Sequence, residues 1–172
     1  MFSDRRVSLR AARVLSTLLV VLALAACTQG CSDDDNPVTP GYEFADLEAR
    51  TLALVNQHRA SKGLGSLSSN DVIVEQARQH SSNMAKKTVA FGHEGFNDRV
   101  AVIQTKISLS SAGENVAMMS GMADPAQAAF NGWLNSAGHK ANMEGDFNLT
   151  GMGIAKNTDG AYYFTQIFVK SR

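Results

Sequence analysis

The chain has 172 residues, no formal net charge, 44% hydrophobic residues and 19% charged residues. This composition is that of a globular protein, and the length suits one ordinary domain with room for a leader. Four arginines face one aspartate in residues 1–26, so the remainder is mildly acidic with scattered basic residues. Such a body has no electrostatic footprint for nucleic acid, and we expect no nucleic-acid partner.

Residues 1–26 are predicted to be a lipoprotein signal peptide. Arginines precede an apolar run over residues 14–26, which is shorter than the roughly 20 residues of a membrane span. The run ends in Leu24-Ala-Ala-Cys27, which resembles a bacterial lipobox and implies lipid on the Cys27 thiol. The alternative is an ordinary secretory peptide cut nearby. The lipobox predicts a protein of the bacterial cell envelope, facing outside the cytoplasm. Because Thr28 rather than Asp follows the cysteine, we expect the outer membrane rather than the inner one in a cell that has both.

An acidic segment follows and is predicted to be a solvated tether over residues 27–42, since it contains little that can be buried. We place the folded domain at residues 43–172. The other cysteine of the chain is Cys31, which has no partner if Cys27 is lipidated. The domain is therefore expected to hold together without a disulfide.

Helical periodicity marks the first half of the domain. Residues 43–62 are predicted to form a helix that Gly63 ends, and a second helix, capped by Ser68, runs to about Lys86. His80 lies on or beside the buried face of the second helix, where a hydrogen-bonded core histidine is expected. Residues 92–95 form a glycine-flanked loop that can present His93, and a short helix covers residues 98–105.

The second half of the domain mixes strands with one further helix. Residues 107–111 read as an entry strand, and residues 112–119 as a small-residue turn feeding a strand. Asp124-Pro125 predicts a helix start, and that helix ends near Asn135 or Ser136. Residues 149–156 and 161–169 alternate like two strands of a hairpin. Helices first and an antiparallel sheet last indicate an α+β layered sandwich, with helices on both faces of a central antiparallel sheet.

Three separate segments supply the candidate site: His93, Glu114 and His139, which we expect to share one cleft. Two imidazoles and a carboxylate could bind a divalent metal such as Zn²⁺, or work as an acid–base pair whose glutamate fixes one tautomer. Ser136 would share a face with His139 on a continuous helix, which permits a serine hydrolase, although no Gly-x-Ser-x-Gly motif is present. A purely structural role also fits, with Glu114 and Asn115 tying a turn and Asn142 capping or bridging.

These segments resemble motifs of the CAP superfamily, the cysteine-rich secretory, antigen 5 and pathogenesis-related proteins, and most of all its bacterial, disulfide-free branch. The resemblance covers roughly residues 46–169. The motifs are Leu54-Val-Asn-Gln-His, Ala77-Arg-Gln-His, Phe91-Gly-His, Ala112-Gly-Glu-Asn-Val-Ala, Gly132-Trp-Leu-Asn-Ser-Ala-Gly-His-Lys-Ala-Asn142, Gly151-Met-Gly-Ile-Ala and Tyr163-Phe-Thr-Gln-Ile-Phe. The resemblance implies a three-layer α-β-α sandwich.

The resemblance also implies a cleft with two histidines and two acidic residues, which binds a divalent metal in some members. His93, Glu114 and His139 match three of these four positions, and Ser136 stands at the fourth. Lys140 replaces the usual arginine of the motif, and Glu144 replaces an apolar residue.

Family function is diverse, so we expect a binding or interaction module for a small ligand, lipid or peptide, with the possibility of an enzyme left open. The alternative is a metal-dependent or serine-type hydrolase acting on peptide or envelope material. The residues expected to line the ligand cleft are His93, Glu114, Asn115, Ser136, His139 and Asn142.

Overall fold

The computed structural model describes residues 43–172. The signal peptide, the Cys27 lipobox and the tether were predicted for residues outside this range. Within residues 43–172, no helix is long and apolar enough to cross a membrane. The helices are α1 (Ala45–Ser61), α2 (Asp71–Ala85), α3 (Phe96–Gln104), α4 (Pro125–Leu134) and α5 (Ala137–Met143), and the strands are β1 (Ser68–Ser69), β2 (Leu109–Met119), β3 (Leu149–Lys156) and β4 (Tyr162–Ser171).

The four strands form one sheet in the order β1-β3-β4-β2. β4 pairs antiparallel with both β3 and β2, whereas the two-residue β1 pairs parallel with β3. The sheet is therefore mixed rather than purely antiparallel as predicted, because a short edge strand joins it in the other direction. The predicted hairpin of β3 and β4 is confirmed.

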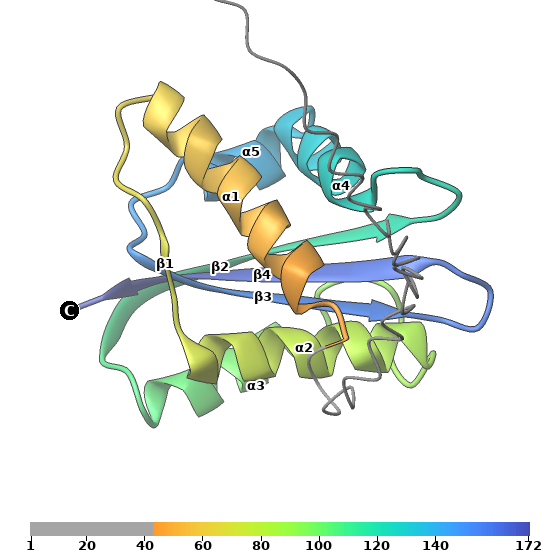
Figure 1. Ribbon diagram of the computed structural model, residues 1–172. Helices are drawn as coiled ribbons and strands as arrows, with labels where there is room; N and C mark the ends of the chain where they lie inside the picture. The colour runs from red at the N-terminus through yellow and green to blue at the C-terminus, as the bar shows by residue number, and fades with distance from the viewer. Residues whose placement is uncertain (1–42) are drawn as a thin grey trace, which may run out of the picture. The chain divides into compact units, whose positions relative to one another are not determined.

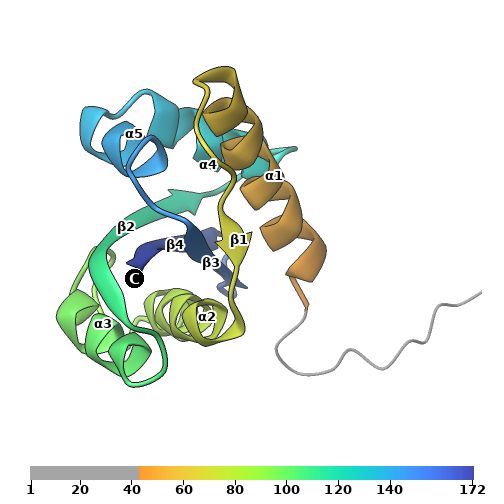
Figure 2. The ribbon, with the colours of Figure 1, turned by 90° about the vertical axis from the view of Figure 1, so that its left-hand side faces the viewer.

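Helices cover both faces of the sheet, which confirms the three-layer sandwich. α1, α4 and α5 lie on one side, and α2 and α3 lie on the other (Figures 1 and 2). Alternate residues of β4 supply cores on the two faces of the sheet: Phe164 and Phe168 pack in the core with α1 and α4, and Ile167 packs with α2 and α3. All three side chains are fully buried.

The helix starts follow local capping chemistry. Asp124 accepts a hydrogen bond from the Gln127 backbone N–H, and Pro125 occupies the first turn of α4, as predicted. The cap of α2 is Asn70, which accepts from the Val72 N–H. The prediction of Ser68 as that cap is wrong, because Ser68 is already paired in β1.

The buried line of α1 is not purely apolar. It runs through Glu48, Thr51, Val55 and Arg59, so two of its members are charged. Glu48 accepts a forked pair of hydrogen bonds from Arg78, and it also meets the Ile154 backbone N–H. The Arg59 guanidinium donates to four backbone carbonyls, those of Gly65, Met143, Gly145 and Phe147. These partners satisfy charges whose burial would otherwise be costly.

Candidate functional site

The site lies on β2, an edge strand of the sheet. The segment around Gly113, Glu114 and Asn115 was predicted to be a turn, but it is extended and paired with β4 over residues 166–168. Successive side chains of a strand point to opposite faces. Glu114 therefore faces the side of α3, where it meets Arg99, whereas Asn115 faces the side of α5, where it meets His139, and this one strand serves both halves of the site.

Glu114 is held by a cation that the sequence analysis did not single out. Its side chain is 2% exposed, and its carboxylate accepts hydrogen bonds from Arg99 Nε at 3.0 Å and from an Arg99 terminal nitrogen at 2.9 Å. His93 Nδ1 lies 3.0 Å from the same carboxylate. Because a carboxylate only accepts, His93 Nδ1 must donate, and its Nε2 is left for another partner.

The loop that presents His93 is held on both sides. His80 Nε2 donates to the Gly92 carbonyl at 2.8 Å, which confirms the expectation of a hydrogen-bonded core histidine. Gly95 adopts a φ of 74°, a left-handed conformation that favours glycine, and α3 begins directly after it. Arg99 also donates to the Glu94 carbonyl at 2.9 Å. Arg99 therefore fixes both the carboxylate and the loop.

His139 comes from α5 and is placed by two asparagines. The Asn115 amide donates to the His139 carbonyl at 3.0 Å, and the Asn142 amide donates to the Glu114 carbonyl and to Asn115 Oδ1. A Cβ on Gly113 would lie 2.9 Å from Asn142 Oδ1, so glycine leaves room for this contact. Asn142 therefore bridges α5 to β2, as one of the expected structural roles.

The two imidazoles face each other across the edge of β2. The ring centroids of His93 and His139 are 6.5 Å apart and the ring planes are tilted by 48°. Burial lowers the pKa of His139, and the nearby His93 lowers it further. His139 therefore stays neutral at neutral pH, with one donating and one accepting nitrogen.

The predicted helix end near Asn135 or Ser136 is confirmed, so Ser136 does not share a continuous helix with His139. α4 ends at Leu134, and Ser136 is the extended N-cap residue of the next helix, α5. Its hydroxyl makes no capping hydrogen bond. Asn135, the C-cap residue of α4, and Ser136, the N-cap residue of α5, therefore separate the two helices.

The donor set does not fit the divalent metal site predicted from His93, Glu114 and His139. Both oxygens of Glu114 already accept hydrogen bonds from Arg99, whose positive charge would oppose a cation there. Across residues 43–172, no group of three or more His, Cys, Asp or Glu side chains is arranged to hold a metal ion. The three residues meet, but as an arginine-neutralised cluster, which we call the histidine cluster.

Two cavities of the domain lie away from the histidine cluster. One of about 540 Å³ lies between α1 and α2 and is lined by Glu48, Arg78 and their neighbours. The other, of about 310 Å³, lies beside the β3–β4 turn. None of the six residues expected to line a ligand cleft contributes to either cavity.

Arg99 is the main residue of the site that sequence reasoning missed. A signal for it exists, because Arg99 stands between Phe96 and Ile103 on the apolar stripe of a short helix. A cation on a buried stripe requires an anionic partner, and Glu114 provides it.

Comparison with solved structures identifies the fold. An outer surface protein of Borrelia burgdorferi superposes with a TM-score of 0.63 at 20% identity, covering 76% of this chain and 96% of that one. An extracellular protein of Bacillus anthracis that contains an SCP domain superposes with a TM-score of 0.58 at 28% identity, covering 73% of this chain and 41% of that one. The shared architecture is the α-β-α sandwich described above.

Comparison at the level of sequence gives the family. An uncharacterized membrane protein of Bacillus subtilis is 33% identical over 129 residues, which cover 72% of this chain. The match spans 34% of that relative, about a third of its length. The model of the cysteine-rich secretory protein family, CAP, matches residues 52–168. This chain is therefore a member of the CAP family.

Proposed function

We propose that this chain is an extracytoplasmic binding module, anchored to a bacterial membrane by lipid on Cys27, whose histidine cluster binds a small polar ligand. The proposed location is supported by the relatives, one named as extracellular and one as a membrane protein. The lipobox sequence at Leu24–Cys27 supports the anchor. The domain has no cysteine beyond residue 31, as expected of the disulfide-free branch.

The observation that carries the binding proposal is the convergence of two imidazoles from separate elements on one sheet edge. His93 has a side chain that is 51% exposed and an Nε2 that faces away from Glu114. His139 adds a neutral imidazole with one donor and one acceptor. Because Arg99 neutralises Glu114, the cluster suits a ligand that exchanges hydrogen bonds, such as a short peptide, rather than a cation.

Hydrolysis receives no comparable support. A serine mechanism needs an imidazole within hydrogen-bond reach of the nucleophile, and residues 43–172 contain no hydrogen bond between the Ser136 hydroxyl and His93 or His139. A metal-dependent mechanism needs the ligand set that Arg99 compromises. Binding is therefore the function that the geometry supports best.

The binding proposal is tested by NMR of the imidazole rings, with acetylated trialanine as the probe. We expect the peptide to shift the His93 and His139 resonances in a saturable way. His139→Ala should abolish the response, whereas His58→Ala, which removes a histidine paired with Glu144 outside the cluster, should retain it. A response that survives His139→Ala would contradict the assignment of the site.

The anchor is tested separately by Cys27→Ser in the full chain. We expect this variant to lose incorporation of labelled fatty acid and to leave the membrane fraction when the membranes are washed with high salt, which removes proteins held only by charge. A variant that stays with the membrane and still takes up label would contradict lipidation at Cys27.

A further inference from the structure

One end of the sheet, which we call the hairpin end, carries a small core of its own. It lies where β2 finishes and where the β3–β4 turn reverses the chain (Figure 1). Its buried members are Met84, Ala85, Val116, Ala161 and Tyr163. The rim of this core exposes two kinds of side chain that bear on function.

The first kind is basic. Lys86, Lys87 and Lys156 are exposed and line the hollow of about 310 Å³ beside the turn. Asp159 lies 3.8 Å from Lys87, and Lys156 Nζ lies 4.7 Å from the centre of the Tyr162 ring. Three lysines against this one aspartate leave the hollow positively charged.

The second kind is apolar. Large hydrophobic side chains exposed within residues 43–172 number four, and three of them belong to the hairpin end: Phe91, Met118 and Met122, each about half exposed. The Phe91 ring lies 6.3 Å from the Tyr163 ring, and Met118 is opposite Tyr163 in the ladder of β2 and β4. Met122 follows the end of β2 by three residues. Apolar exposure is therefore concentrated on one side of the domain rather than scattered.

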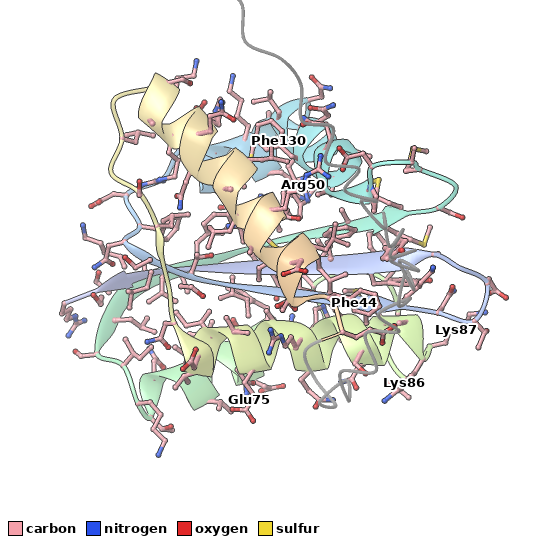
Figure 3. The ribbon with its side chains drawn as sticks, viewed as in Figure 1. Phe44, Arg50, Glu75, Lys86, Lys87 and Phe130 are labelled. Atoms are coloured by element: carbon pink, nitrogen blue, oxygen red, sulfur yellow. The ribbon has the colours of Figure 1, made fainter. Side chains whose placement is uncertain are left out.

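The domain also begins at this end. The Phe44 ring packs edge-on against Tyr162 at 5.9 Å, and Tyr162 is opposite Lys156 in the hairpin. Figure 3 shows Phe44 on the same side as Lys86 and Lys87. Cys27 precedes the domain by 16 residues, a length of chain that spans at most about 55 Å.

We propose that the hairpin end docks on an anionic lipid bilayer, with its lysines at the lipid phosphates and Phe91, Met118 and Met122 in the interface. Lysines bring the domain to a negative surface, and half-exposed apolar side chains at their side gain by leaving water. The proposal that this docking occurs in the cell rests on the proposed lipid anchor at Cys27. The hairpin end itself would bind a bilayer without that anchor. Glu114 precedes Met118 by four residues of extended strand, about 13 Å, and His93 follows Phe91 by two residues, so docking places the histidine cluster beside the bilayer surface.

The test uses residues 27–172 with Cys27→Ser, which contain all three cores of the domain and carry no lipid. Sedimentation with vesicles of phosphatidylcholine that contain about 30% phosphatidylglycerol should pull the protein down, and neutral vesicles should not. The double variant Lys86→Gln, Lys87→Gln should weaken the partitioning to anionic vesicles at least tenfold, because each lysine contributes about fivefold. The matched pair Lys62→Gln with Lys106→Gln changes two exposed lysines outside the hairpin end and should have no such effect.

The apolar part is tested in the same assay. Phe91→Ser and Met122→Ser should each weaken binding several-fold, whereas Val102→Ser, at an exposed hydrophobic residue of α3, should not. Absence of binding to the anionic vesicles, or equal losses in the test and control variants, would overturn the proposal. Such a result would not count against lipidation of Cys27, because the assayed protein carries no lipid anchor. Conversely, a Cys27→Ser variant that stayed in cell membranes and still took up labelled fatty acid would contradict the anchor at Cys27 but not the binding to vesicles.

Discussion

Arg99 holds Glu114 with two nitrogens, at 3.0 and 2.9 Å from its two carboxylate oxygens, in a setting where the Glu114 side chain is 2% exposed. The pair joins α3 to the edge strand β2 and leaves His93 as the third member of the contact. We expect Arg99→Ala to destabilise the domain by about 3–5 kcal/mol, because it leaves a buried carboxylate without its cation. Urea unfolding of both proteins measures the difference.

The matched control is Arg50→Ala. Like Arg99, Arg50 pairs with an acidic residue, in this case Asp124, but the Arg50 and Asp124 side chains are 56% and 36% exposed. Exposed pairs of this kind contribute about 0–1 kcal/mol. A loss of less than about 1 kcal/mol in Arg99→Ala would show that water compensates Glu114 and that the pair is not structural.

The sequence predicts the meeting of His93, Glu114 and His139 better than it predicts their chemistry. Glycines around His93 and the dense polar run before Asn142 are local signals. The neutralisation of Glu114 depends on α3 packing against β2, which no local pattern reveals. Arg99 could have been suspected only from its place on an apolar stripe.

A zinc titration tests that chemistry. We expect calorimetry to give equal heats for the wild type and for His139→Ala, because Arg99 occupies both oxygens of the one carboxylate in the cluster. A saturable heat in the wild type that vanishes in His139→Ala would mean that an ion displaces Arg99. The predicted metal site would then stand.

Secondary structure was predictable where its cause is local. Asp124-Pro125 starts α4, and the Asn157–Gly160 turn joins β3 to β4, both through short-range chemistry. Two predictions failed where the cause is distant. Ser68 belongs to a strand only because it lies beside Leu149, and residues 112–115 are strand rather than turn because β4 pairs with them. Pairing across the sheet overrides weak strand propensity.

Stability should fall as the pH is lowered from about 7.5 to about 5.5. Burial lowers the pKa values of His80 and His139 below 6.5 in the folded protein. The unfolded chain therefore binds more protons in the range below 6.5, and stability is lost as the pH falls through the lowered pKa values. In His80→Gln, whose amide can still donate to the Gly92 carbonyl, the pH-dependent loss should be smaller. Unfolding curves with equal pH dependence in both proteins would contradict this account.

Close packing of α2 on β3 depends on two glycines. A Cβ on Gly151 would lie 2.3 Å from backbone atoms of Ile73 and Val74, and one on Gly153 would lie 2.2 Å from backbone atoms of α2. Backbone cannot yield as a flexible side chain does, so we expect either alanine substitution to cost about 3 kcal/mol. Differential scanning calorimetry of the variants measures the loss.

Gly138→Ala is the matched control and should change stability in the opposite direction. Gly138 lies in α5, a Cβ built on it has no atom within 4 Å apart from its chain neighbours and the backbone of its own helix, and its φ is not left-handed. Alanine there should stabilise the helix by about 0.5–1 kcal/mol, because it removes freedom from the unfolded chain. If Gly151→Ala and Gly138→Ala changed stability alike, the separation of α2 from β3 would have to be larger than the described contacts allow.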